Sequence, residues 1–414
     1  MQEFGLLGLK LAHSYSPAIH EAFGGYSYVL FEVEDLADFM KNAKFKGINI
    51  TIPYKQEVMQ YCQTLSPTAK EIGSVNTILR LPNGDFYGDN TDAAGFKKLL
   101  PTLYSNPTES CIPFTSGQTP LRKKTIIFGN GGSSLSVSYV MKELGEIVVV
   151  SRKNNNNEFL HQQKDAAILV NSTPVGMYPN VGESPVSLDY FPNLELVIDL
   201  IYNPARTKLM MDADQRGIPN IGGLTMLVGQ AAASSEMFTG NKVTNQQAVV
   251  QMLRHRMENI ILIGMPGSGK TTHGSLLAKI LNKSFIDTDA EIEKIAGCTI
   301  PEIFEKEGEN AFREKETEVI RKFGKESGLV IATGGGCVTR EENYRHLHQN
   351  GKIIFTERSL DKLSRENRPL SQGNLHDMYE KRLPLYRRFA DIAVQCDGEP
   401  AHVAEKIIDE MRIL

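Results

Sequence analysis

The chain has 414 residues, 41% of them hydrophobic and 23% charged, which excludes a wholly disordered chain, a collagen or a coiled coil. Its 45 basic and 49 acidic residues give a net charge of −4, so no general basic excess attracts nucleic acid. Small phosphorylated or carboxylated ligands stay possible, because they need only a local cluster of basic residues.

Short apolar runs alternate with amphipathic stretches along most of the chain, which predicts an α/β architecture with parallel sheets. In the first hundred residues we expect strands at 4–8, 28–32 and 47–52. The Pro-, Ser- and Thr-rich segment 101–122 is expected to be a loop or linker. Further on we expect strands at 125–128, 147–150, 167–171 and 196–199, a helix at 133–144 and a long helical stretch at 224–256.

Polar residues of the first hundred positions could form a catalytic cleft. The string HSYSP contains Ser14 and Ser16, although Ser16 followed by Pro17 would also make a good helix N-cap. Lys55 follows a predicted strand and a proline, and Asp92 stands at a predicted helix start. A lysine and an aspartate in one cleft can transfer a proton beside a carbinol. Taken singly, an exposed lysine and an N-capping aspartate are the alternatives.

Residues 129–134 read GNGGSS between a predicted strand and a predicted helix. The pattern departs from G-x-G-x-x-G, but its place in a βαβ unit indicates dinucleotide binding. The next strand ends at Arg152 and Lys153, where an acidic residue would hold an NAD ribose, so the sequence favours NADP; a solvated basic turn is the alternative. Only about 14 residues lead from Arg152 to the next strand, so we expect a shortened crossover that leaves the adenine side of the coenzyme open.

Seven strings in order resemble the shikimate dehydrogenase family over about 1–240: HSYSP, NITIPYK, GSVNT, GDNTD, GNGG, NSTPVGM and GLTMLVGQ. The resemblance implies a substrate domain, a Rossmann-like NADP domain and NADPH-dependent reduction of 3-dehydroshikimate to shikimate. Lys55 and Asp92 would be the catalytic pair. The residues that it assigns to shikimate are Ser14, Ser16, Thr51, Asn76, Asp92, Tyr202 and Gln230. Those that it assigns to NADP are Gly129, Gly131, Gly132, Ser133, Arg152 and Met226.

A second α/β domain begins near residue 259, where the apolar run NIILIGM leads into a glycine-rich turn and an amphipathic helix at 270–282. Residues 264–271 read GMPGSGKT, the full G-x-x-x-x-G-K-[ST] pattern between strand and helix. Such a turn points successive N–H groups at phosphate oxygens. Lys270 can reach the β- and γ-phosphates, and the Thr271 hydroxyl can bind magnesium. A chance match is disfavoured by the two flanking elements, so this half is expected to bind a nucleoside triphosphate.

Charged residues downstream could hold the phosphoryl acceptor. Asp287 and Asp289, at a predicted strand end, could hold magnesium through water or accept hydrogen bonds from hydroxyls, and an acidic helix start at Thr288 or Asp289 is the alternative. Arg313 and Glu316 lie at i and i+3 of a predicted helix, and in isolation they read as a surface ion pair.

The last third adds glycines and arginines to this set. The strand VIATGGG ends in three glycines at 334–336, where backbone must approach another group closely. Arg368 and Arg382 suit clamping of a phosphate or carboxylate. In order, the P-loop, D-T-D, F-R-x-x-E, G-G-G, R-P-L and R-x-P-L-Y resemble the shikimate kinase family across 259–414.

This second resemblance implies a parallel α/β P-loop domain, like the nucleoside monophosphate kinases, that converts shikimate to shikimate 3-phosphate. ATP and Mg²⁺ would be its cofactors, Lys270 would be catalytic, and Thr271 and Asp287 would serve the metal. The implied ATP-binding residues are Gly264, Gly267, Ser268, Gly269, Lys270, Thr271, Thr272 and, on a lid, Arg368. The implied shikimate-binding residues are Asp289, Arg313, Gly335, Gly336 and Arg382.

Together these patterns predict a bifunctional enzyme with a substrate domain at 1–100 plus 224–256, an NADP domain at 101–223 and a kinase domain at 257–414. We expect small-molecule substrates, neither nucleic acid nor membrane, and a homodimer as one possible assembly. Five scattered cysteines, no signal-peptide pattern and no apolar run near the roughly 18 residues of a membrane helix indicate a cytoplasmic protein. Two alternatives stay open: an NAD(P)-dependent quinate/shikimate dehydrogenase joined to a kinase for another small polyol, and a ligand-sensing chain with one degenerate, binding-only half.

Overall fold

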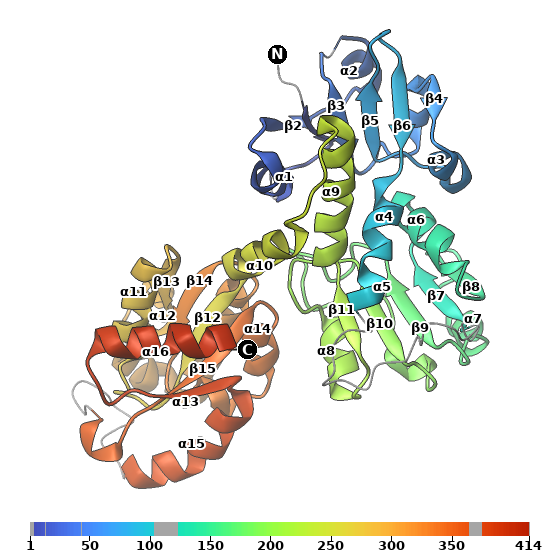
Figure 1. Cartoon of the computed structure of the whole chain (residues 1–414). Helices are drawn as coiled ribbons and strands as arrows, with labels where there is room; N and C mark the ends of the chain where they lie inside the picture. Colours follow the sequence, from blue (N-terminus) through green and yellow to red (C-terminus); the bar gives the residue numbers. More distant parts are fainter. Residues whose placement is uncertain (1–3, 13, 43, 103–122, 364–374, 414) are drawn as a thin grey trace. The chain divides into compact units, whose positions relative to one another are not determined.

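The computed structural model describes residues 4–12, 14–42, 44–102, 123–363 and 375–413. It divides into two compact units, one formed by Met1–Tyr202 with Thr207–Leu253 and the other by Asn203–Arg206 with Arg254–Leu414. Each unit is α/β, as the alternation of apolar runs predicts (Figure 1). None of the helices in the described ranges is long and apolar enough to cross a membrane.

The first unit opens with a six-stranded mixed sheet in the order β2-β1-β3-β5-β6-β4. Its strands are β1 (Phe4–Gly8), β2 (Tyr28–Glu32), β3 (Gly47–Ile50), β4 (Thr64–Leu65), β5 (Thr77–Arg80) and β6 (Phe86–Asp89). Its helices are α1 (Ser16–Gly24), α2 (Leu36–Asn42), α3 (Pro67–Ile72) and the 3₁₀ helix η1 (Glu57–Tyr61). Leu7, Ile48 and Ile78 are fully buried, so the apolar strands form the core of this layer.

The second sheet of this unit is entirely parallel, in the order β11-β10-β9-β7-β8. Its strands are β7 (Thr125–Phe128), β8 (Ile147–Val150), β9 (Ile168–Asn171), β10 (Leu196–Asp199) and β11 (Asn220–Gly222). The associated helices are α6 (Gly132–Met141), α7 (Asn157–His161), η2 (Leu188–Tyr190) and α8 (Lys208–Gln215). This arrangement gives the strand–turn–helix geometry that dinucleotide-binding sheets use.

Two helices run between these sheets, α4 (Thr91–Lys97, followed by α5, Leu99–Thr102) and α9 (Leu224–Thr239) (Figure 1). They pack closely, because a β-carbon placed on Gly95 would lie 2.6 Å from the Met226 carbonyl oxygen. The helical stretch predicted at about 224–256 is helical but consists of two helices. Helix α9 ends at Gly240, whose φ of 73° is left-handed, and α10 (Gln246–Met257) is a separate helix.

The second unit holds a five-stranded parallel sheet in the order β13-β14-β12-β15-β16. Its strands are β12 (Asn259–Ile263), β13 (Ser284–Asp287), β14 (Leu329–Ala332), β15 (Gly351–Glu357) and β16 (Ile392–Gln395). Its helices are α11 (Lys270–Ile280), α12 (Thr288–Ala296), α13 (Ile300–Gly324), α14 (Glu342–His348), α15 (Leu375–Phe389) and α16 (Pro400–Ile413), with the 3₁₀ turns η3 (Cys337–Thr339) and η4 (Leu360–Lys362). The central strand β12 leads into the glycine-rich turn, which therefore opens at the carboxyl edge of the sheet.

Candidate active sites

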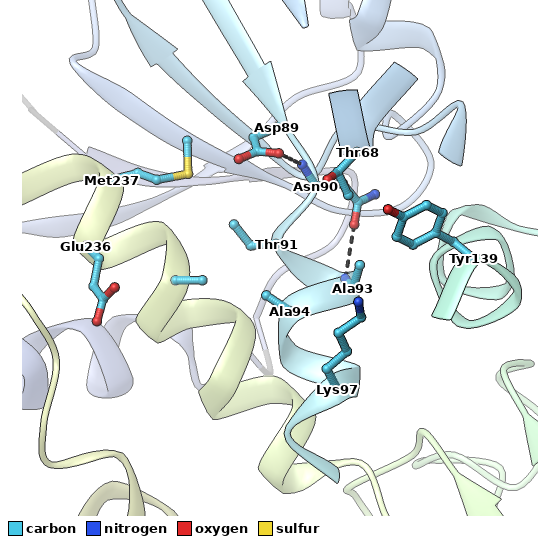
Figure 2. A pocket seen from close by; sticks show the side chains of 11 residues that line it. Thr68, Asp89, Asn90, Thr91, Ala93, Ala94, Lys97, Tyr139, Glu236 and Met237 are labelled. Carbon is cyan, nitrogen blue, oxygen red and sulfur yellow. Dashed lines mark hydrogen bonds between the residues drawn. The ribbon is translucent and has the colours of Figure 1, made fainter. Parts of the chain in front are cut away.

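The structure of the first unit brings Lys55 and Asp92 together. Lys55 Nζ lies 2.6 Å from Asp92 Oδ2, and the two side chains are only 11% and 7% exposed. Asp92 is the second residue of α4, and the helix is capped by Asn90, whose side chain accepts from the Ala93 N–H (Figure 2). The alternative of an N-capping aspartate is therefore wrong, and the Asp92 carboxylate is left for the lysine.

Two more of the predicted residues surround this pair. Asn76 Nδ2 donates to Asp92 Oδ1 at 2.9 Å and reaches Gln230 Oε1 at 3.4 Å. The close approach of α4 and α9 at Gly95 makes this possible, because it seats Gln230 beside the first turn of α4. The result is a polar cluster drawn from the loop after β3, the start of β5, α4 and α9. Such a cluster is suited to a hydroxyl-rich ligand.

In the described part of the chain, the other residues expected to bind the substrate have no hydrogen bond to the Lys55–Asp92 pair. Ser16 is buried as the first residue of α1 and makes no capping hydrogen bond, so the N-cap interpretation of Ser16 is wrong. Instead, Ser14 Oγ accepts from the Ser16 N–H at 3.2 Å. Burial raises the pKa of Tyr202, whose ring stands 6.2 Å from that of Tyr15. Within the described ranges, no hydrogen bond joins Ser14, Thr51 or Tyr202 to the Lys55–Asp92 pair.

The glycine-rich turn after β7 lies beside Lys55. Gly129 has a φ of 116°, which favours glycine, and Gly131 is the N-cap of α6. A β-carbon placed on Gly132 would lie 3.0 Å from both Lys55 Cδ and Ser74 Oγ, so a larger residue there would force these side chains to shift by a few tenths of an ångström. Ser133 follows in the first turn of α6, whereas Met226 is 7% exposed and packs in the core of the unit.

The predicted coenzyme-selecting arginine is exposed at the edge of the second sheet. Arg152 follows β8, the edge strand, and Asn154 holds the turn by accepting from the Ser151 N–H at 2.6 Å. The connection to β9 contains only α7, a five-residue helix. The expectation of a shortened crossover after Arg152 is therefore confirmed.

A hollow of about 480 Å³ lies beside α4 in this unit (Figure 2). Asn90, Ala94 and Lys97 line it, and helical periodicity puts these positions on the face of α4 opposite Asp92. Tyr139, Glu236 and other residues of α3, α6 and α9 complete the wall, and none of them was a predicted site residue.

In the second unit, the GMPGSGKT turn has the backbone of a phosphate cradle. Gly269 is the N-cap of α11 with a φ of 88°, a conformation that needs glycine. Lys270 Nζ donates to the carbonyl oxygens of Gly264 and Met265, each at 2.9 Å, so the ammonium lies folded over the turn. A helix N-terminus and a lysine at the mouth of the turn attract an anion.

The donors expected for magnesium meet at the next strand end. The Thr271 hydroxyl donates to Asp287 Oδ2 at 2.7 Å. Asp287 Oδ1 accepts from the N–H groups of Asp289 and Ala290, so the cap of α12 is Asp287 rather than Thr288 or Asp289. The described residues contain no group of three or more His, Cys, Asp or Glu that could hold a metal by itself. A hydroxyl and one carboxylate fit a Mg²⁺ that takes its other ligands from phosphates and water.

Arg313 and Glu316 form a buried pair, so the interpretation as a surface ion pair is wrong. Arg313 Nη1 lies 2.7 Å from Glu316 Oε2, and the side chains are 7% and 0% exposed. The third glycine of the predicted run, Gly336, lies against this guanidinium, since a β-carbon there would be 2.2 Å from it. Helical periodicity correctly places Arg313 and Glu316 on one face of the helix. Their burial also depends on the glycine run at 334–336, about twenty residues later in the sequence.

Asp289 lies beside this pair and faces Glu316. Asp289 Oδ1 and Glu316 Oε1 are both buried without a hydrogen-bond partner. Burial, then the negative charges of Glu316 and Asp287, raise the pKa of Asp289 to about 7. A carboxyl group with such a pKa can accept a proton near neutral pH. Burial also raises the pKa of Glu316. From the sequence, this residue is expected only as the partner of Arg313.

Asp289, Arg313 and Glu316 line a cavity of about 450 Å³, and the glycine-rich turn lines the same cavity. Arg382 lines it and donates to the Gly335 carbonyl oxygen at 3.1 Å. The predicted residues on its wall are Gly267, Gly269, Lys270, Thr271, Thr272, Asp287, Asp289, Arg313, Gly335, Gly336 and Arg382. Ser268 is buried behind the turn and bonds Thr356, while Arg368 lies outside the described residues. The wall also includes Arg358, which no sequence motif had singled out.

Comparison with known proteins accounts for both units. Residues 6–78 match the family model described as the shikimate dehydrogenase substrate binding domain. A shikimate dehydrogenase (NADP(+)) of Clostridium beijerinckii is 37% identical over 272 residues, 59% of this chain and 95% of that protein. The chain belongs to the shikimate dehydrogenase family. Residues 266–412 match the shikimate kinase family model, so a shikimate kinase domain follows the dehydrogenase part.

Other relatives of the dehydrogenase part agree. A shikimate dehydrogenase (NADP(+)) of Methanococcus vannielii is 34% identical over 60% of this chain and 96% of its own length. Among solved structures, shikimate dehydrogenase 1 from Peptoclostridium difficile is 34% identical with a TM-score of 0.52, covering 61% of this chain and 98% of that one. The enzyme from Thermus thermophilus in complex with NADP(H) and shikimate is 29% identical with a TM-score of 0.50, covering 61% and 99%.

Proposed function

We propose that this protein is a bifunctional shikimate-pathway enzyme that reduces 3-dehydroshikimate to shikimate with NADPH and phosphorylates shikimate to shikimate 3-phosphate with MgATP. The observation that carries the proposal is that one chain holds two polar sites. One has the Lys55–Asp92 pair beside a dinucleotide-type turn, and the other has a carboxylate and arginines beside a P-loop. Both families named by the comparisons act on the same metabolite, shikimate.

In the dehydrogenase unit, Lys55 is the proposed proton donor to the substrate carbonyl as it becomes a hydroxyl, while NADPH supplies the hydride. Asp92 keeps the ammonium 2.6 Å away and oriented, and it accepts hydrogen bonds from substrate hydroxyls. Asn76 and Gln230 extend the polar wall from Asp92, and Ser14, Ser16, Thr51 and Tyr202 are proposed to complete it. Hydrogen bonds to several hydroxyls fix the carbonyl in one orientation.

The coenzyme site has donors of the right kind for NADP. The open N-terminus of α6, formed by Gly131, Gly132 and Ser133, can bind a pyrophosphate, and Gly129 supplies the turn before it. Exposed Arg152 is proposed to pair with the 2′-phosphate, and Met226 to line the nicotinamide side. Because the crossover after Arg152 is short, little protein covers the adenine side.

In the kinase unit, Asp289 is proposed to accept the proton of the attacking shikimate hydroxyl, because its raised pKa poises it near neutrality. Arg313 and Arg382 hold the substrate carboxylate, with Gly335 and Gly336 giving room. Lys270 neutralises charge on the transferred phosphoryl group, and the proposed lid residue Arg368 adds to it. Thr271 and Asp287 would hold Mg²⁺, which would offset the negative charge of the phosphates.

The domain boundaries, the assembly and the cellular compartment belong to the same proposal. The domains are proposed to be 1–100 with 224–256, 101–223 and 257–414, one around each sheet. Assembly as a homodimer is proposed, with sedimentation as its test. A cytoplasmic location is proposed because the scattered cysteines fit a reducing compartment.

Two variants separate the two activities. Lys55→Ala should lower dehydrogenase kcat by at least ~10²-fold, the usual contribution of a positioned acid, and leave kinase turnover unchanged. Asp289→Asn should do the reverse. The activity that each variant keeps shows that the other unit is intact, and an unchanged Tm shows that the substituted unit is folded. Loss of both activities from a folded single variant would contradict two separate sites.

A further inference from the structure

The cavity of the kinase unit has one arginine that none of the resemblances assigns. Arg358 directly follows β15, which is hydrogen-bonded along its length to β12, the strand that leads into the P-loop. The end of β15 is tied to that loop, since Thr356 Oγ1 lies 2.9 Å from Ser268 Oγ. Arg358 therefore lines the cavity beside Gly267 because of the sheet topology.

The guanidinium of Arg358 is anchored at one atom and unpaired at another. Its Nη1 donates to the Gly267 carbonyl oxygen at 3.3 Å. Its Nε is buried and has no hydrogen-bond partner. Leaving a buried N–H unpaired costs free energy, so this donor is available to an acceptor oxygen that enters the cavity.

The charge around Arg358 indicates the sign of that acceptor. In the part of the chain that the structure describes, no carboxylate forms an ion pair with Arg358. One titratable neighbour of Arg358 at the loop is His273, whose ring packs against Gly269 and whose pKa is lowered by burial and by the charge of Arg358. Lys270 adds a second cation at the same turn. An arginine with an open donor, next to the lysine of a P-loop, favours an anion with several acceptor oxygens.

We propose that Arg358 is a nucleotide-binding residue that donates to a phosphate oxygen of the nucleoside triphosphate while it holds the Gly267 carbonyl in place. The inference rests on the kinase function proposed above. It adds a phosphate contact from the end of β15 to those from the P-loop itself. The contact is specific to arginine, because lysine has the charge but neither the Nε–H nor the planar fork.

The test is calorimetric titration of the full-length chain with ATP, ADP and AMP, for the wild type, Arg358→Ala and Arg358→Lys. Loss of a charged hydrogen bond should weaken ATP and ADP binding roughly 10- to 100-fold in Arg358→Ala, with a smaller loss for AMP. Arg358→Lys should recover only part of the loss. Kinase KM for ATP should rise more than kcat falls, and added guanidinium ion should restore part of the affinity of Arg358→Ala.

Two controls accompany these variants. Arg321→Ala removes an exposed arginine of α13 and should leave nucleotide affinity unchanged. Dehydrogenase turnover of Arg358→Ala should equal that of the wild type, which reports that the first unit is undisturbed, and an unchanged Tm of the kinase unit reports that the second unit is folded. An equal loss for all three nucleotides, or full recovery with lysine, would overturn the phosphate contact. Unaltered ATP binding by Arg358→Ala would overturn this inference alone, whereas a wild type that binds no ATP would overturn the kinase proposal with it.

Discussion

The facing carboxylates of the kinase cavity make the pH dependence of the kinase a sharp test. A β-carbon placed on Gly334 would lie 2.5 Å from Glu316 Oε1 and 2.6 Å from Asp289 Oδ1, so these oxygens are no more than about 5 Å apart. Glu316 is one of the charges that raise the pKa of Asp289 to about 7. If Asp289 must be ionised to accept the hydroxyl proton, kinase activity rises with pH through that value.

Glu316→Gln removes one negative charge and keeps the shape of the side chain. At 5 Å and an effective dielectric constant near 20, one charge is worth about 3 kcal/mol, partly offset by Arg313. Since a lost negative neighbour makes Asp289 easier to ionise, the acid limb should move to lower pH by roughly one to two pH units. The limb is measured from initial rates of shikimate 3-phosphate formation, followed directly by ³¹P NMR.

The matched control is Glu309→Gln. Glu309 also pairs with Arg313, at 3.3 Å, but it is 57% exposed, so solvent screens its charge. Its removal should leave the acid limb in place. An unmoved limb in a folded Glu316→Gln chain, with dehydrogenase activity intact, would refute the coupling of Glu316 to Asp289.

Two further predictions concern the bound cofactors. Arg152→Gln should raise KM for NADPH roughly 10- to 100-fold, the cost of a charged hydrogen bond, and leave KM for NADH unchanged; steady-state kinetics with both coenzymes checks this. The control is Lys142→Gln, which removes an exposed charge at the C-terminal end of α6, and equal losses for both coenzymes in Arg152→Gln would contradict the prediction. Asp287→Asn should raise the Mg²⁺ concentration for half-maximal kinase activity several-fold. The Tm should change little, because asparagine still caps α12. A lowered Tm with an unchanged Mg²⁺ requirement would show that Asp287 is only a cap.

Local sequence predicts most of the strands of both units. The strands at 4–8, 28–32, 125–128, 147–150 and 196–199 are confirmed at both ends, because each is a short apolar run bounded by turn residues. The break in the helical stretch after residue 224 was missed, although Gly240 was a signal for it. A C-terminal glycine in the left-handed region ends a helix even where apolar periodicity continues.

The candidate sites depend on contacts that no local pattern contains. The spacing of Arg313 and Glu316 is that of a common surface pair, and only the packing of Gly334 and Gly336 against them makes the pair buried. Arg358 belongs to no motif, and its place beside Gly267 follows from the pairing of β15 with β12. The proximity of Gly132 to Lys55 likewise arises where the second sheet meets the loop after β3.

The most direct test of the account is one incubation of the intact chain with 3-dehydroshikimate, NADPH and MgATP, with the products identified by mass. Two working sites predict shikimate 3-phosphate when both cofactors are present, shikimate alone when MgATP is left out, and no product when NADPH is left out. Shikimate that accumulates without phosphorylation in the complete mixture would contradict the assignment of the kinase unit. Unreduced 3-dehydroshikimate would contradict that of the dehydrogenase unit.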